Sequence, residues 1–170
     1  MEVLDFTPRL VRDLAQEVAA RQGSGIAFQS TAVAALGAVE RAQISLRDAH
    51  SAALSLAQQV RMADMQAELD AAAHALDQVL DNQGRCLMEP APKGLRRIAL
   101  RFSNKGESGK SWWTITDEAV SQLGQDIERL TALMAGQTEQ SPARRLCQAV
   151  ASLLRSQRAQ LAAEATRWEA

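Results

Sequence analysis

The stretch Phe28-Gln29-Ser30-Thr31-Ala32-Val33-Ala34-Ala35-Leu36 opens the longest helical pattern of this chain. From it, apolar residues recur at spacings of three and four for about thirty residues, which places them on one face of an α-helix. These residues are Ala32, Leu36, Val39, Ala42, Leu46, Ala49, Ala53, Leu56 and Val60. The stretch therefore predicts a long central helix that is packed along its whole length and ends at a brief turn.

A shorter helix is expected on each side of the long one. Thr7-Pro8 predicts a helix start, because the hydroxyl accepts from free backbone amides and proline fits the first helical turn. Glycines at positions 23 and 25 are expected to end that helix. Arg61 and Met62 form the predicted turn after the long helix, and Asp64 is placed to cap a third helix that continues to Leu80. The first half thus predicts the order short, long, short.

The second half shows a similar but less regular pattern. Between positions 93 and 102, Leu95, Ile98 and Phe102 share one helical face, and arginines occupy the other. A polar loop is expected over residues 103–111, followed by a helix that Thr114 or Thr116 caps and that ends at Gly136. The pair Ser141-Pro142 predicts the start of a last helix, which extends toward Trp168. Three helices are therefore expected here as well.

The composition and the charge distribution indicate a helical protein with one basic region. The chain has 170 residues, of which 46% are hydrophobic and only 4% are aromatic, a composition that favours an all-α protein. Its net charge of −1 argues against attraction to nucleic acid by bulk charge. Residues 1–80 carry six Arg against ten acidic residues, whereas residues 81–110 carry seven Lys or Arg against three. A surface that binds anions is therefore expected in the second segment.

Several classes of protein are not expected from this sequence. Cys86 and Cys147 stand apart without metal-ligand spacing, and no catalytic combination of side chains occurs, so neither an enzyme nor a metal or other cofactor is predicted. The segment Gly106–Ser111 is similar to a nucleotide-phosphate loop, but Asn104 stands at the position of the first glycine of that motif. No apolar run approaches the length of a membrane span, and no leader segment is expected.

Two parts of the chain resemble core histones. Residues 6–80 resemble histone three, through 9–18 (RLVRDLAQEV) and 28–36 (FQSTAVAAL). Residues 81–158 resemble histone four more distantly, through 95–99 (LRRIA) and 153–155 (LLR). The resemblance implies a fused histone doublet without the long basic tails. Residues 1–84 would form one histone fold and residues 85–170 a second one with a C-terminal helical extension. The two folds would cross as a pseudo-heterodimer in which each half covers the apolar face of the other.

The resemblance also implies a function and a set of site residues. A histone doublet compacts or organises double-stranded DNA by contacting phosphates without sequence specificity. The implied phosphate-contacting residues are Arg9, Arg12, Arg96, Arg97, Arg101, Lys105 and Lys110. Self-assembly is expected between positions 50 and 69, through His50, Arg61, Asp64 and Leu69. Implied partners are a second copy and other histone-fold proteins, with no membrane contact, in the nucleus or chromatin, or in a virion or viral factory.

Some positions depart from the histone pattern and leave other interpretations open. Gln58-Gln59, Ala27 and Glu139 occupy positions at which the family has basic residues, so weak DNA binding is expected. One alternative is a histone-fold interaction module of a transcription, kinetochore or chaperone complex that binds little DNA. In a second alternative, only the first half is a histone fold and residues 114–168 form a plain helical hairpin. The pair Trp112-Trp113 either stacks on bases or fills the edge of a core.

Overall fold

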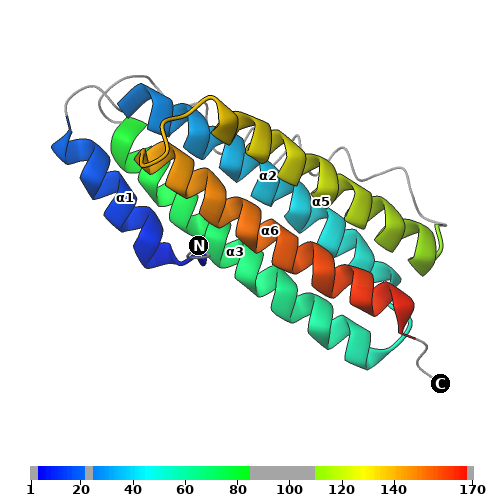
Figure 1. The fold of residues 1–170 in the computed structure, drawn as a ribbon. Helices are drawn as coiled ribbons and strands as arrows, with labels where there is room; N and C mark the ends of the chain where they lie inside the picture. The colour runs from blue at the N-terminus through cyan, green and yellow to red at the C-terminus, as the bar shows by residue number, and fades with distance from the viewer. Residues whose placement is uncertain (1–3, 22–24, 85–109, 168–170) are drawn as a thin grey trace.

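The structure, a computed structural model, describes residues 4–21, 25–84 and 110–167, and these residues form an all-α protein. No strand occurs in these three ranges, so the expected fold class is confirmed. The helices are α1 (Pro8–Ala20), α2 (Gly25–Ala52), α3 (Leu56–Gly84), α5 (Trp112–Ala135) and α6 (Pro142–Thr166). Figure 1 shows α2, α3, α5 and α6 side by side as a bundle, with α1 packed against its flank.

The bundle consists of two antiparallel helix pairs. One pair is α2 with α3, the other is α5 with α6, and α2 packs against both helices of the second pair. The short α1 packs chiefly against α3 and α6. Figure 1 shows that α3 ends where α2 begins, whereas α5 begins at the opposite end of the bundle. Gly84 and Lys110 therefore lie at opposite ends of the bundle.

The expected course of the first half is wrong at the end of its long helix. The helix ends at Ala52 and not at Val60, and the next helix begins at Leu56. Arg61, Met62 and Asp64, expected to form a turn and a cap, lie inside α3. Because α2 and α3 have 28 and 29 residues, the first half does not follow the order short, long, short.

The turn between α2 and α3 is stabilised by two side-chain hydrogen bonds, and the residue types that make them form a known local sequence pattern. The Ser55 hydroxyl accepts from the backbone amide of Gln58 at 3.2 Å. The side-chain oxygen of Gln58 in turn accepts from the backbone amide of Leu54 at 2.8 Å. A serine followed three residues later by glutamine is the pattern of a capping box, which satisfies free amides at the start of a helix. The apolar spacing of three and four continues across this turn and therefore does not reveal it.

The other helix ends agree with the sequence in part. The starts at Thr7 and Ser141 are confirmed, because each hydroxyl accepts from the amide three residues later. Helix α5 ends at Gly136, as expected. Its expected caps are wrong, since Ser111 caps the helix and the Thr116 hydroxyl donates inside it to the carbonyl of Trp112 at 2.9 Å. Gly25 begins α2 and does not end α1, whose last residue is Ala20.

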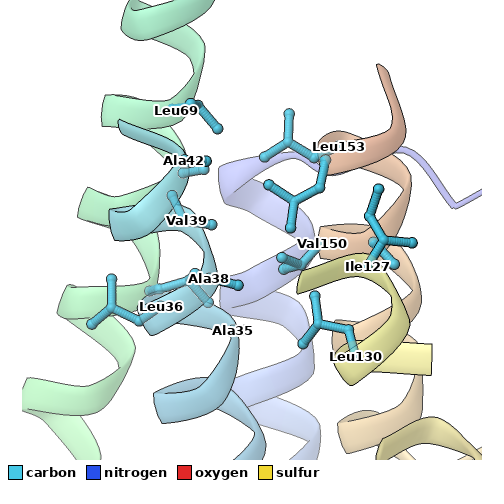
Figure 2. Packing of buried hydrophobic residues seen from close by; sticks show 14 of the residues in the cluster. Ala35, Leu36, Ala38, Val39, Ala42, Leu69, Ile127, Leu130, Val150 and Leu153 are labelled. Atoms are coloured by element: carbon cyan, nitrogen blue, oxygen red, sulfur yellow. The ribbon is translucent and has the colours of Figure 1, made fainter. Parts of the chain in front are cut away.

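A single apolar core runs through both helix pairs. Figure 2 shows side chains of α2 and α3, such as Val39 and Leu69, beside Ile127 of α5 and Val150 of α6. Many of the buried α2 positions are alanines, and small side chains allow neighbouring helices to approach closely. In the described part of the second half, α5 and α6 form a helical hairpin, as one of the alternative interpretations expected.

Candidate functional site

The expected DNA-contacting residues are not brought together within the described part of the chain. Arg9 and Arg12 are exposed on α1, and Arg9 pairs with Asp13 at 3.8 Å. Lys110 lies at the bundle end where α5 begins, and its ammonium group contacts both carboxylate oxygens of Glu118 at 2.9 and 3.0 Å. The other four expected residues, Arg96, Arg97, Arg101 and Lys105, lie outside the described residues.

The expected self-assembly residues have different surroundings. Leu69 is completely buried in the core, and Arg61 pairs with Glu164 of α6 at 2.6 Å. Both side chains therefore make their contacts within one chain. Asp64 is exposed on α3, and His50 is half-buried in the last turn of α2. Of these four residues, only Asp64 is exposed in this structure.

Three large apolar side chains are exposed at the turn between α2 and α3. Leu54, Leu56 and Val60 expose 70%, 75% and 52% of their surface, and we call them the apolar turn patch. Leu56 and Val60 lie one helical turn apart on α3, so they share a face. The periodic pattern wrongly placed these two residues inward, because it treated them as part of the preceding helix. The patch nevertheless falls within positions 50–69, where self-assembly is expected.

Helix α6 carries several arginines to which the sequence analysis assigned no role. It contains Arg144, Arg145, Arg155 and Arg158, with Arg167 directly after it, against the single carboxylate of Glu164. Each of these arginines makes a hydrogen bond or ion pair to a protein group, for example Arg145 to Glu17 of α1 at 2.9 Å. Arg155 and Arg158 make no ion pair with the described residues. They border a hollow of about 280 Å³ between α5 and α6.

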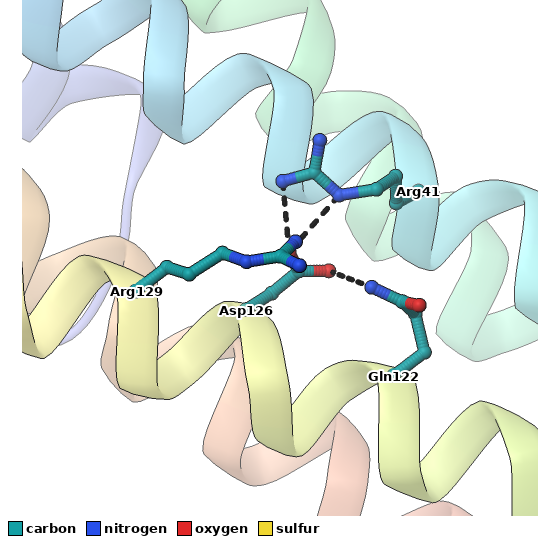
Figure 3. A network of polar contacts seen from close by, with 4 residues as sticks. All are labelled: Arg41, Gln122, Asp126 and Arg129. Atoms are coloured by element: carbon teal, nitrogen blue, oxygen red, sulfur yellow. Dashed lines mark hydrogen bonds and ion pairs between the residues drawn. The ribbon is translucent and has the colours of Figure 1, made fainter.

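A network of four polar side chains links α2 to α5. The Asp126 side chain is fully buried, and its Oδ1 accepts from Nε and Nη2 of Arg41 at 2.9 and 2.8 Å. Arg129 donates to the same oxygen through Nη1 at 3.2 Å, and Gln122 donates to Oδ2 at 3.1 Å. Figure 3 shows both guanidinium groups converging on this carboxylate. Two cationic groups therefore share one buried anion.

The sequence contains only half of the signal for this network. Gln122, Asp126 and Arg129 follow helical spacing and therefore share one face of α5. Arg41 lies 85 positions away in the sequence from Asp126, and only the packing of α2 against α5 brings them together.

The remaining candidate groups have structural surroundings. Cys147 is buried in the core, and burial raises the pKa of its thiol to about 11, so little reactive thiolate is present near neutral pH. Trp112 is buried, whereas Trp113 is exposed, so the first of the pair fills a core edge as one interpretation expected. Within the described ranges no cluster of three or more metal-ligating side chains occurs. The helices in these ranges include none that is long and apolar enough to cross a membrane.

Comparisons with known proteins give no relative for this chain. No family model, no curated protein and no solved structure matches it. The resemblance to core histones therefore depends only on the short sequence stretches quoted above.

Proposed function

We propose that this protein is a helical-bundle interaction module that binds a second copy of itself through the apolar turn patch. The observation that carries this proposal is the exposure of Leu54, Leu56 and Val60 within seven positions at one end of the bundle. Fully burying one such side chain is worth roughly 1.5–3 kcal/mol, and the best-buried apolar residues dominate the energy of an interface.

The location of the patch supports association between identical copies. A patch at a bundle end is accessible to the same patch of another molecule, and a two-fold axis then buries both surfaces at once. Asp64 lies one turn beyond Val60 on α3 and is exposed, so it is placed to form the polar rim of such an interface. The proposal retains self-assembly between positions 50 and 69 and assigns it to different side chains.

Sedimentation equilibrium over a range of protein concentrations tests this proposal. We expect the unaltered protein to show a dimer whose population rises with concentration. The double variant Leu56→Gln plus Val60→Gln removes most of the patch and keeps helix-forming residues, so it is expected to remain monomeric. The control Leu133→Gln changes an exposed apolar residue of α5 and should leave the dimer intact. A monomer at all concentrations, or equal dimerisation of the double variant, would contradict the proposal.

A second candidate function is binding of double-stranded DNA, as implied by the histone resemblance. It is favoured by residues 85–109, which carry six Lys or Arg against two Glu, and by Arg155 and Arg158 of α6. Each phosphate contact made by such residues releases counterions, so binding of this kind weakens as salt rises. This role was expected for a crossed histone doublet. The nearly equal lengths of α2 and α3, 28 and 29 residues, count against that arrangement.

A gel-shift assay with duplex DNA at low and moderate salt tests this second function. We expect binding that weakens with salt and that falls further in the double variant Arg96→Ala plus Arg97→Ala. The exposed α2 residue Arg47, changed to alanine, serves as a control for loss of charge alone. Absence of any shift at low salt would remove DNA binding and leave the self-association proposal unaffected.

A further inference from the structure

Of the two arginines around Asp126, Arg129 is not needed to satisfy the buried carboxylate. Arg41 alone satisfies Oδ1 of the buried carboxylate through two donors, and Gln122 satisfies Oδ2. Arg129 adds a third donor to Oδ1 from a side chain that is 61% exposed. An ion pair at such an exposed position adds little to stability, because water screens it. Arg129 therefore adds little to stability and is able to serve another acceptor.

The charges at this site do not balance within the described residues. Asp126 is the one carboxylate that pairs with Arg41 or Arg129 there, so two positive groups share one negative group. Because both head groups bond the same oxygen, they are held close together in spite of their mutual repulsion. An anion that approaches from solvent meets a positive site that already has its final geometry, which lowers the entropic cost of binding.

Three guanidinium nitrogens at the site make no hydrogen bond to the described residues. Arg41 donates to Asp126 through Nε and Nη2, so its Nη1 is not used for this carboxylate. That Nη1 lies on the side of Gly37, 3.4 Å from where a Cβ atom at this position would be. Arg129 uses only Nη1, which leaves Nε and Nη2 for another acceptor. The side chain of Arg41 is 42% exposed, so both arginines are reachable from outside.

We propose that Arg41 and Arg129 bind a phosphate group, either free inorganic phosphate or the terminal phosphate of a small phosphomonoester. The guanidinium group presents planar pairs of N–H donors that match the spacing of phosphate oxygens. Asp126 acts as the positioning residue, because it holds both arginines toward each other without contacting the phosphate. This site is separate from the apolar turn patch, which consists of residues of the α2–α3 turn and the first part of α3.

NMR titration of the arginine Nε–H signals tests the proposal directly. Inorganic phosphate is added at constant ionic strength, with chloride as the balancing anion. We expect saturable shifts of the Arg41 and Arg129 signals, and no saturable shift of the Arg47 signal. A parallel titration with phenyl phosphate distinguishes the two sources. Tighter binding of the ester indicates a phosphomonoester ligand, whereas equal or weaker binding indicates the free ion.

Two matched variants distinguish a binding site from a purely structural network. Arg129→Gln keeps the Arg41–Asp126 pair and is expected to weaken phosphate binding about tenfold, because it removes charged donors to the ligand. Arg47→Gln removes one exposed positive charge from α2, the helix that carries Arg41, and should leave the affinity for phosphate unchanged. Circular dichroism confirms that both variants fold. The proposal is overturned by absence of saturable shifts, or by equal losses of affinity in both variants, which would indicate general counterion binding.

Discussion

Asp126 is the side chain whose removal we expect to affect stability most among the charged residues. Replacing it with alanine leaves Arg41 and Arg129 close together without their shared anion, and it breaks hydrogen bonds to charged donors. We expect Asp126→Ala to lower the free energy of unfolding by about 2 kcal/mol, a value that allows for the partial exposure of both arginines. Urea denaturation followed by circular dichroism measures this loss.

Glu128 provides the matched control for that measurement. It is an exposed carboxylate on the same helix, two positions from Asp126. Glu128→Ala should change the free energy of unfolding by less than about 0.5 kcal/mol. Equal effects of the two substitutions would show that the buried network has no special role in stability.

Cys147 gives a prediction about the pH dependence of stability. Burial raises the pKa of its thiol from an ordinary value of 9.0 to about 11, so the folded state retains this proton over a range in which the unfolded state loses it. The stabilising effect is complete below pH 9 and is lost as the pH rises from about 9 to about 11. Comparing the unfolding of the protein with that of Cys147→Ala across this range isolates the effect. Equal pH dependence in the two proteins would contradict it.

Glycines inside helices give a prediction about helix α5. Glycine weakens a helix interior by roughly 0.5–1 kcal/mol relative to alanine. A methyl group at Gly124 would lie 3.4 Å from the guanidinium group of Arg158, which is held only by an exposed hydrogen bond to the Val120 carbonyl at 3.2 Å and is able to shift slightly. We therefore expect Gly124→Ala to raise the free energy of unfolding by about 0.5–1 kcal/mol.

Gly37 of α2 is the informative comparison for this substitution. There, a methyl group would lie 3.4 Å from Nη1 of Arg41, whose head group is fixed by Asp126. Gly37→Ala should therefore stabilise the protein less than Gly124→Ala does, in the same thermal or urea unfolding experiment. The reverse order would indicate that the Arg41 head group is not held in place.

Helix ends show how far local sequence determines an element. Thr7-Pro8, Ser141-Pro142 and Gly136 were predicted correctly, because a cap or a helix stop depends on contacts within a few residues. The α2–α3 turn was missed although Ser55 and Gln58 carry an equally local signal. There the apolar spacing suggested one continuous helix. A hydrophobic pattern indicates which face of a helix is apolar, but it does not indicate where the helix ends.

The bundle as a unit is expected to unfold in one step. Its core contains side chains from both helix pairs, and Arg61 of α3 also pairs with Glu164 of α6 at 2.6 Å. Neither pair is able to keep its apolar face covered without the other. We expect the urea transition seen by circular dichroism, which reports all helices, to coincide with that seen by tryptophan fluorescence, which reports Trp112, Trp113 and Trp168 in the second half of the chain. Separate transitions would show that the two pairs are independent folding units.

The amino-acid sequence alone was sufficient to establish an all-helical chain and several helix ends. These features arise from residues within one or two helical turns, so a linear pattern contains them. The pairing of Arg41 with Asp126, the burial of Leu69 and the exposure of Leu56 depended instead on how the two helix pairs pack. Residues distant in the chain meet only through that packing, and helical periodicity does not specify which apolar faces come together.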